Sequence, residues 1–214
     1  MNRGFSKVVM GCALFVALAT GLWLYVSYGN VKQAAIEKRK AETASYLQKR
    51  AAALLKAEYF NEEDPALRQQ AFQSFFDAVQ APDLVRMKIW NRDFTVVWSE
   101  LRELIGQRFP DNHDVKEALE GKIEFELAES KDETVSERAF QALSETYVPF
   151  FNAKGEVVGV LEVYQPVTTL NEEIQSRFQS SAMTALVFAA VAFGILVLAG
   201  WLLTKRERTV GGRA

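Results

Sequence analysis

Two long stretches without a charged residue constrain this 214-residue chain more than any other feature of its sequence. Residues 8–28 and 182–203 contain no Asp, Glu, Lys or Arg over 21 and 22 positions. An α-helix needs about 20 apolar residues to cross the roughly 30 Å hydrocarbon core of a membrane. Both stretches carry aromatic residues suited to the headgroup regions, at Trp23, Tyr25 and Trp201. The sequence therefore predicts two transmembrane helices.

The first stretch has two alternative interpretations. Residues 17–19, Ala-Leu-Ala, have the small-x-small spacing of a signal-peptide cleavage site. The apolar run continues through Val26, however, which suits an uncleaved anchor better. Cys12 follows Lys7 after only four residues, whereas the apolar region before a lipoprotein cysteine needs about 7–15. We therefore expect a membrane anchor in which Cys12 is an ordinary apolar residue.

The distribution of charge predicts the orientation of the chain. Residues 1–7 carry a charge of +2 and residues 204–214 a charge of +3, while residues 29–181 contain 19 basic and 26 acidic side chains. Basic residues within 32–40 favour the opposite orientation, but long loops cross membranes largely regardless of charge. Because positive flanks face the cytoplasm, we expect both termini to be cytoplasmic and residues 29–181 to lie outside.

The composition also excludes several classes of function. The one cysteine lies in the first apolar stretch, so the sequence offers no disulfide and no cysteine-based metal site. A net charge of −2 without a basic patch argues against a nucleic-acid partner. The sequence contains no nucleophile elbow, phosphate-binding loop or pair of catalytic carboxylates. We expect neither an enzyme nor a cofactor.

A group of acidic residues lies around His113, the single histidine of the chain. Its members are Asp111, Asp114 and Glu117. Capping and the helix dipole favour acidic residues at the start of a helix, and one oxygen-rich cluster is not a zinc site. We therefore expect a helix N-terminus here and no metal.

Residues 29–82 are predicted to be helical. Residues 31–60 contain neither Gly nor Pro, which favours one long helix. Its apolar stripe consists of Leu47, Ala51, Leu54 and Leu55. A second helix is expected at about 65–80, because Asp64 is a good N-cap and Pro65 suits the first helical position. Its packing face would consist of Leu67, Ala71, Phe75, Ala78 and Val79.

Alternating apolar and polar residues then predict strands. The expected strands are 84–90 and 95–99, joined as a hairpin by NRDF, then 122–128, 142–152 and 156–167. Helical stretches are expected at 101–105 and between Asp111 or Asn112 and Gly121. Ile123, Phe125 and Leu127 would point inward. The pattern predicts an α+β fold, with a five-stranded antiparallel sheet, helices packed on one face and a long helix before it.

A resemblance to a known family is carried by four segments: IWNRDFTVVWS, LIGQRF, ALEGKIEFE and YVPFFNAKGEVVGVLEVY. The stretch that contains them, 83–165, resembles the PAS-like, or Cache-like, extracytoplasmic sensor domains of bacterial receptors with two transmembrane helices. The resemblance implies a first hairpin, a helical segment over a pocket and a final hairpin within residues 83–167. The sequence itself predicts a helix at 168–181 that leads directly into the second span. The resemblance also implies a periplasmic domain anchored in the inner membrane. It implies no particular ligand, because such domains bind diverse small molecules or none.

The candidate binding site lies on the first predicted strand. Arg86 and Lys88 share one strand face, and a carboxylate ligand would suit two cations with aromatic walls. The aromatic residues expected nearby are Trp90, Trp98, Tyr147 and Tyr164. The alternative interpretation is that this face is solvated, or that the cations pair with Glu124 or Glu162.

The predicted membrane helices carry small residues at intervals that allow close helix packing. These residues are Ala13, Ala17 and Gly21 in the first span, and Ala185, Ala189 and Gly194 in the second. Alanine is frequent enough in both spans to produce such a pattern by chance. Two interpretations are therefore equally good: these faces pack against another helix, or the spacing arose by chance.

Two functions are compatible with these features. The first is a sensor-like module in which a ligand or partner outside shifts the two bounding helices and another membrane protein reads the movement. Residues 204–214 correspond to no kinase, cyclase or chemoreceptor tail, so we expect no catalytic output in this chain. The second function is a structural accessory subunit of a larger membrane complex, such as a respiratory or photosynthetic one. A truncated receptor is a third interpretation. The expected partners are the bilayer, another membrane protein or a second copy of the chain, and a small molecule for the sensor.

Overall fold

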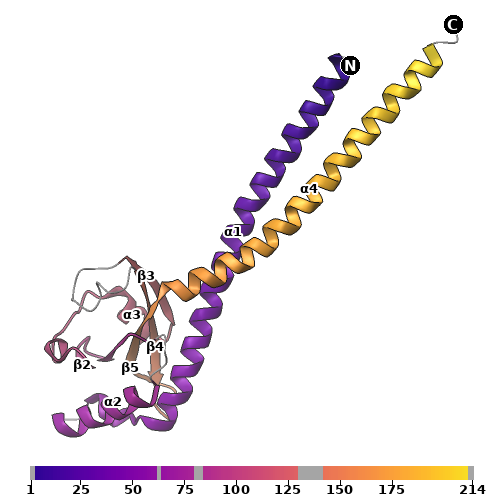
Figure 1. The fold of residues 1–214 in the computed structure, drawn as a ribbon. Helices are drawn as coiled ribbons and strands as arrows, with labels where there is room; N and C mark the ends of the chain where they lie inside the picture. Colours follow the sequence, from indigo (N-terminus) through magenta and orange to yellow (C-terminus); the bar gives the residue numbers. More distant parts are fainter. Residues whose placement is uncertain (1–2, 62–63, 80–83, 130–141, 212–214) are drawn as a thin grey trace. The chain divides into compact units, whose positions relative to one another are not determined.

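The computed structural model describes residues 3–61, 64–79, 84–129 and 142–211. The chain divides into two compact units, one of residues 36–171 and one of residues 1–35 with 172–214. The helices are α1 (Arg3–Leu54), the 3-10 helix η1 (Ala57–Asn61), α2 (Pro65–Val79), the 3-10 helix η2 (Arg102–Leu104), α3 (His113–Leu119) and α4 (Val167–Gly211). The strands are β1 (Arg86–Asn91), β2 (Val96–Ser99), β3 (Glu124–Glu129), β4 (Ala142–Phe151) and β5 (Val157–Pro166) (Figure 1).

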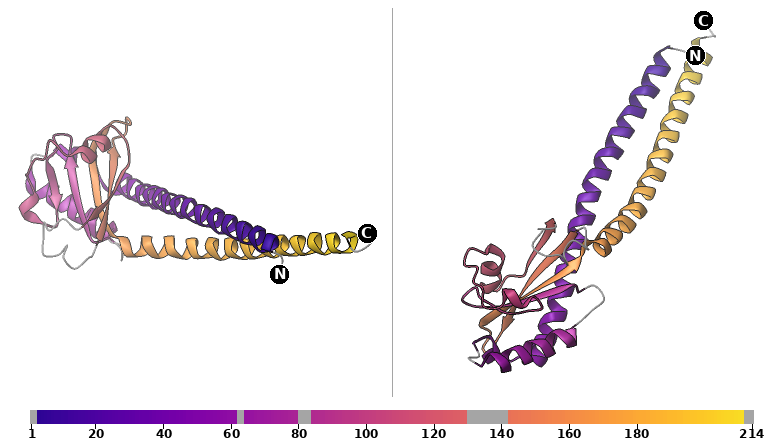
Figure 2. Two further views of the ribbon diagram at one scale, coloured as in Figure 1. Left: turned by 90° about the horizontal axis from the view of Figure 1, so that it is seen from above. Right: turned by 60° about the vertical axis from the view of Figure 1, so that its left-hand side comes forward.

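The five strands form one antiparallel sheet in the order β2-β1-β5-β4-β3. Figure 2 shows the ribbon from two further directions. A tight turn joins β4 to β5. In this turn the side-chain oxygen of Asn152 accepts hydrogen bonds from the backbone N–H groups of Lys154 (2.9 Å) and Glu156 (3.0 Å), and Gly155 has a φ of 80°. Asn and Gly supply these two features at low cost. The predicted α+β class, with a five-stranded antiparallel sheet and a long helix before it, is confirmed.

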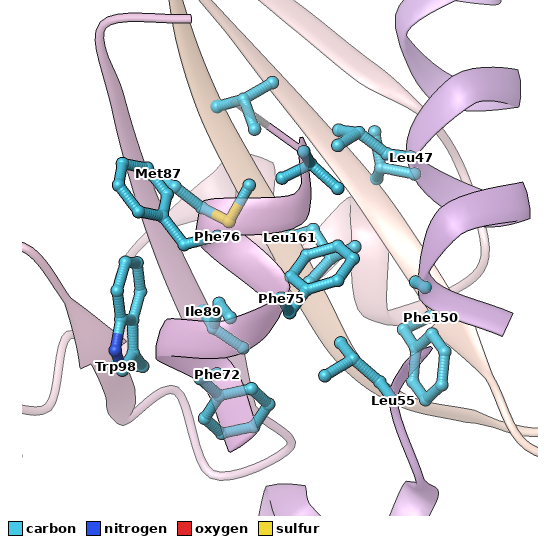
Figure 3. Packing of buried hydrophobic residues seen from close by; sticks show 14 of the residues in the cluster. Leu47, Leu55, Phe72, Phe75, Phe76, Met87, Ile89, Trp98, Phe150 and Leu161 are labelled. Atoms are coloured by element: carbon cyan, nitrogen blue, oxygen red, sulfur yellow. The ribbon is translucent and has the colours of Figure 1, made fainter. Parts of the chain in front are cut away.

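One face of the sheet is filled by apolar side chains from α1 and α2 (Figure 3). Leu47 and Ala51 lie one helical turn apart on α1 and are fully buried. The contribution of α2 is Phe72, Phe75, Phe76 and Val79, which share one face of that helix. The strands supply Met87, Ile89, Val97, Trp98, Val148, Phe150, Leu161 and Val163. This face is a packed core.

The opposite face carries α3 and a second, smaller apolar cluster. The cluster consists of Trp90, Val96, Val115, Ala118, Tyr147 and Val160. Helix α3 begins at Asn112, whose side-chain oxygen accepts a hydrogen bond from the N–H of Val115 at 2.9 Å. The prediction that helices pack on only one face is therefore wrong. The physical reason is that β1 buries side chains on both of its faces, so both faces need a cover.

Some helix ends differ from the sequence prediction. Helix α1 ends at Leu54, and residues 57–61 form a separate 3-10 helix where the long helix was expected to continue. The helical stretch expected at 101–105 contains only the 3-10 helix η2. Asp64 does cap α2, because its Oδ1 accepts hydrogen bonds from the N–H groups of Ala66 (2.8 Å) and Leu67 (3.4 Å).

Two predicted packing faces are also corrected. Leu67 and Ala78 of α2 are exposed, and Phe72 and Phe76 are buried in their place. Burying a phenylalanine removes more apolar surface from water than burying an alanine. Leu127, expected to point into the core, is 38% exposed. It lies on β3, the edge strand of the sheet, where fewer neighbours cover a side chain.

The second unit contains the apolar parts of α1 and α4. The predicted spans 8–28 and 182–203 lie within these helices, which are long and apolar enough to cross a membrane. Large apolar side chains are exposed on both, among them Leu14, Phe15, Leu18, Leu22, Phe188 and Ile195. Exposed apolar surface of this extent is typical of helices that face lipid. Within this unit the ring of Tyr28 meets that of Phe178 edge-on at 5.2 Å.

Candidate ligand-binding pocket

A pocket of about 370 Å³ opens on the face of the sheet that carries α3. We call it the α3-side pocket. Its lining consists of Lys88, Trp90, Val96, Leu104, Gln107, Phe109, Asn112, Glu145, Tyr147 and Tyr164. Strand register explains why these side chains meet, since cross-strand partners point to the same face of a sheet. Glu145 lies opposite Tyr164, while Tyr147 and Lys88 both lie opposite Glu162.

Residues 105–109 are held over the pocket by backbone pairing with β2 and the turn before it. The N–H of Gly106 donates to the carbonyl of Val96 at 2.8 Å, and the N–H of Phe109 donates to the carbonyl of Phe94 at 2.9 Å. The ring of Phe109 then meets Trp90 edge-on at 5.6 Å. The resemblance implied a helical segment over a pocket, but residues 105–109 contain no helix, and the 3-10 helix η2 ends just before them at Leu104.

Glu162 is the centre of a buried polar network beside the pocket. Its side chain is 1% exposed. It accepts hydrogen bonds from Lys88 Nζ at 3.2 Å, from Trp90 Nε1 at 2.6 Å and from the hydroxyl of Tyr164. Lys88 also donates to the hydroxyl of Tyr164 at 2.6 Å. Lys88 therefore pairs with Glu162, as one of the two interpretations of the sequence stated.

The other predicted cation, Arg86, is buried and only 5% exposed. Its guanidinium lies over the ring of Tyr164, 5.6 Å from the ring centroid, and Lys88 Nζ lies 5.0 Å from the same centroid. Both are cation–π distances. The interpretation of this strand face as solvated is therefore wrong.

Glu145 is the carboxylate that lines the pocket. It is 7% exposed and accepts a hydrogen bond from the hydroxyl of Tyr147 at 2.7 Å. Burial, together with the charge of nearby Glu162, raises the pKa of Glu145 to about 7, against a partial opposing effect of the Tyr147 hydrogen bond and of Lys88. Burial also raises the pKa of Tyr147 and of Tyr164, so both hydroxyls remain protonated and act as donors.

This raised pKa predicts a pH dependence of stability. Between pH 4.5, the usual pKa of the group, and pH 7, the unfolded chain releases a proton that folded Glu145 keeps. The contribution of Glu145 to the free energy of unfolding should therefore be fully present below pH 4.5 and be lost as the pH rises to about 7, a change of about 3 kcal/mol from this group. Chemical unfolding of the wild type and of E145Q at a series of pH values measures the difference. Equal pH dependence in both proteins would contradict the assignment.

The structure brings together four of the six predicted ligand-binding residues. Lys88, Trp90, Tyr147 and Tyr164 line the pocket, and Arg86 lies behind the ring of Tyr164. Trp98 lies on the opposite face, where its ring packs against Phe76 at 5.0 Å between centroids. The sequence analysis missed Glu145, Gln107, Phe109 and Asn112 as pocket residues. Glu145 and Tyr147 are two residues apart in a predicted strand, which was an available signal that they share a face.

His113 lies at the first residue of α3 and is 79% exposed on its side chain. Its Nε2 is 4.0 Å from a carboxylate oxygen of Glu117, one turn later in the helix. Glu117 also forms an ion pair with Lys122. The acidic residues around His113 thus belong to the start of a helix at the protein surface. Of the two expected capping residues, Asp111 and Asn112, it is Asn112 that caps the helix.

The six small residues predicted to pack in the membrane helices have different surroundings. Ala185 and Ala189 line an apolar groove of about 460 Å³ between α1 and α4. The other residues of this groove are Phe15, Val16, Ala19, Thr20, Trp23, Thr184, Phe188 and Ala192. Gly21 and Gly194 face open space within the described chain. Ala13 is half-buried and Ala17 is exposed.

Comparison with known proteins places the chain near bacterial sensor domains in structure only. No protein family and no curated protein matches the sequence. The E. coli DcuS sensor domain is similar, at 14% identity and a TM-score of 0.42, over 68% of this chain and 98% of that one. The sensor domain of the V. cholerae histidine kinase DctB is similar at 17% identity and a TM-score of 0.46, over 74% of this chain and 59% of that one.

A third similar structure is the ligand-binding domain of the Campylobacter jejuni chemoreceptor Tlp3, in complex with 4-methylisoleucine. Its identity is 14% and its TM-score 0.45, over 80% of this chain and 64% of that one. This chain therefore spans less than two thirds of the DctB and Tlp3 domains. All three are bacterial sensor or ligand-binding domains.

Proposed function

We propose that this chain is a membrane-anchored sensor-like protein that binds a small molecule in the α3-side pocket. Residues 8–28 and 182–203 cross the inner membrane of a bacterium, residues 29–181 lie in the periplasm, and both termini are cytoplasmic. The positive charge of residues 1–7 and 204–214 supports this orientation. The proposed activity is binding and contains no catalytic step.

The contrast between the two faces of the sheet carries this proposal. The face against α1 and α2 is filled with apolar side chains, as the core of a domain requires. The other face surrounds a hollow lined by ionisable groups, the buried Glu145 and the partly buried Lys88. Burying such groups costs free energy, and they concentrate at functional sites with few polar groups and aromatic walls. A domain that needed only stability would gain from an apolar filling here.

The structure of unit 36–171 offers a route by which an occupied pocket would affect its bounding helices. Strand β5 carries the pocket residue Tyr164 and is followed directly by α4. The end of β5 and the first turn of α4 are both hydrogen-bonded to α1, from Thr43 to Gln165 at 3.1 Å and from Arg39 to Thr169 at 2.8 Å. Suppose that β5 can adopt two positions and that the ligand binds one of them more tightly. Binding would then favour that position and move α1 and α4, which are linked to β5, with it.

Filling the pocket with an indole ring tests the proposal. Gln107 lines the pocket and is exposed, so Gln107→Trp should occupy the hollow without disturbing the core. Arg102→Trp adds the same side chain at an exposed position of η2 outside the pocket lining. We expect at least one member of a metabolite library to raise the melting temperature of the full chain in nanodiscs. The shift should persist in R102W and disappear in Q107W. Equal shifts in both variants, or no ligand for the wild type, would contradict the proposed function.

The apolar groove between α1 and α4 favours a second candidate, a structural subunit of a larger membrane complex. Its small residues, such as Ala185 and Ala189, would let another helix approach closely. Gentle extraction with a C-terminal tag, followed by mass spectrometry, tests this candidate. A stoichiometric membrane complex would support it, whereas a small monomer or dimer without other proteins would contradict it.

A further inference from the structure

We infer that the α3-side pocket selects positively charged ligands, namely organic amines with an apolar body, and that Glu145 is the residue that pairs with their ammonium group. This inference rests on the proposed function and deepens it, because it assigns the charge of the ligand. The sequence alone had suggested the opposite charge, a carboxylate bound by Arg86 and Lys88.

The cations near the pocket already have partners. Lys88 forms an ion pair with Glu162 at 3.2 Å and donates to the hydroxyl of Tyr164. Arg86 lies against the far side of the network, over the ring of Tyr164, and outside the pocket lining. Lys88 has three N–H groups and uses two of them for Glu162 and Tyr164. A ligand carboxylate would therefore either share this cation with Glu162 or draw it away. Both outcomes leave the carboxylate of Glu162, which is 1% exposed, buried with less of the positive charge that compensates it, which is unfavourable.

Glu145 is in the reverse situation. Its side chain is 93% buried and lines the pocket. Within the part of the chain that the structure describes, its hydrogen-bond partner is the hydroxyl of Tyr147, and no Lys, Arg or His forms an ion pair with it. A ligand ammonium would supply the missing opposite charge and a donor at the same time.

The walls of the pocket suit the same ligand. Trp90, Phe109, Tyr147 and Tyr164 contribute four aromatic rings. The faces of such rings attract cations, and their apolar surface accommodates a hydrocarbon body. Gln107 and Asn112 add neutral polar groups at the segment that covers the pocket. A volume of about 370 Å³ accommodates an amine with one aromatic ring.

Binding of an amine should depend on pH because it needs the ionised form of Glu145. The groups that face Glu145 are Tyr147 on its own strand, Tyr164 and Glu162 on β5, Lys88 on β1 and Glu126 on β3. Burial, together with the charges of the neighbouring carboxylates, raises its pKa to about 7. Between pH 8 and pH 6 the ionised fraction falls about 10-fold, and the apparent affinity falls by the same factor. An alkyl amine stays protonated across this range.

Three probes with the same body and different head groups provide the test. They are 2-phenylethylamine, 2-phenylethanol and 3-phenylpropionate, which are cationic, neutral and anionic. Isothermal titration calorimetry on the full chain in nanodiscs of zwitterionic lipid, with empty nanodiscs as the blank, measures each affinity. We expect the amine to bind at least 10-fold more tightly than the other two at pH 8. Its affinity should fall about 10-fold at pH 6, and about half a proton should be released per amine bound at pH 7.

Two matched variants assign the effect to the pocket. E145Q keeps the shape of the protonated acid, so it should fold, and it should lose both the preference for the amine and the pH dependence. E42Q removes one negative charge from an exposed position of α1 and should bind as the wild type does.

Tighter binding of 2-phenylethanol or 3-phenylpropionate, abolished by Q107W, would overturn the inference and leave the proposed pocket intact. If none of the three probes binds, the inference is tested with any library ligand whose binding is abolished by Q107W. A cationic ligand supports the inference, and a neutral or anionic one overturns it. Absence of every ligand overturns inference and proposed function together.

Discussion

Glu162→Leu is expected to lower the free energy of unfolding of the full chain by about 3–5 kcal/mol. The substitution removes the acceptor for Lys88, Trp90 and Tyr164 at once. Lys88 would then keep a positive charge at a site where its side chain is only 13% exposed, and an uncompensated buried charge is more costly than a missing hydrogen bond. Denaturant titration in detergent micelles, followed by tryptophan fluorescence, measures the loss.

A double-mutant cycle separates this charge effect from the change in shape. Lys88→Met combined with Glu162→Leu replaces both partners with apolar side chains, so it should recover at least half of the stability lost in E162L. Glu42→Leu removes a glutamate from an exposed pair with Lys38 and should change stability by about 0.5 kcal/mol or less. A double variant no more stable than E162L would show that the ion pair is not the source of the loss.

Gly159→Ala is expected to lower the free energy of unfolding by about 3 kcal/mol or more, because the added methyl group has no room at that position. Gly159 is a buried residue of β5. A Cβ there would overlap the ring of Phe60 and the backbone carbonyl oxygen of Trp90. Phe60 cannot move away easily, because its ring stacks on Phe150 at 5.0 Å and meets Phe72 edge-on at 5.3 Å. Strand β1 would have to shift, and Trp90 with it.

Gly155→Ala provides the matched control for this steric effect. Its added Cβ would meet no atom within 4 Å, but its φ of 80° strains any residue with a side chain. That strain should lower the free energy of unfolding of G155A by about 1–2 kcal/mol. Denaturant titration of both variants compares the two costs. A loss in G159A no larger than in G155A would contradict the close approach of Phe60 and β1 to Gly159.

The strands were predictable because their signals are local. The NRDF turn, with alternating residues on both sides, predicted the β1–β2 hairpin, which is present. The arrangement of helices on the two faces was not predictable in the same way. Helix α3 is only seven residues long, and nothing in its own sequence states which face of the sheet it covers. That choice follows from contacts with Tyr147 and Val160, which are distant in the chain.

The candidate site was half predictable, for related reasons. Lys88, Trp90, Tyr147 and Tyr164 were recognised from their residue types and strand positions. Trp98 was misplaced because the β1–β2 register shifts between Ile89 and Trp90, so that Trp98 pairs with Ile89 and faces the core. The side on which a residue lies depends on register, and a one-residue shift reverses it.

Glu145 was missed because a glutamate in an alternating strand ordinarily faces solvent. It is buried here because the segment 105–109 and helix α3 lie over the face of the sheet that carries it. Gln107 and Phe109 were missed because they lie in an irregular segment. Its place over the pocket is set by the pairing of Thr95 with Arg108, a contact that no periodicity in the sequence indicates.

The most direct test of the account is a fluorine NMR measurement on the full chain in nanodiscs, labelled with 5-fluorotryptophan. The chain contains four tryptophans, and two of them report on opposite faces of the sheet. Trp90 lines the α3-side pocket, whereas Trp98 packs against Phe76 in the core. If the pocket binds a small molecule, adding that molecule will move the Trp90 resonance and leave the Trp98 resonance in place. A Trp90 resonance that no member of a metabolite library moves, or a ligand that moves Trp98 alone, would contradict the account.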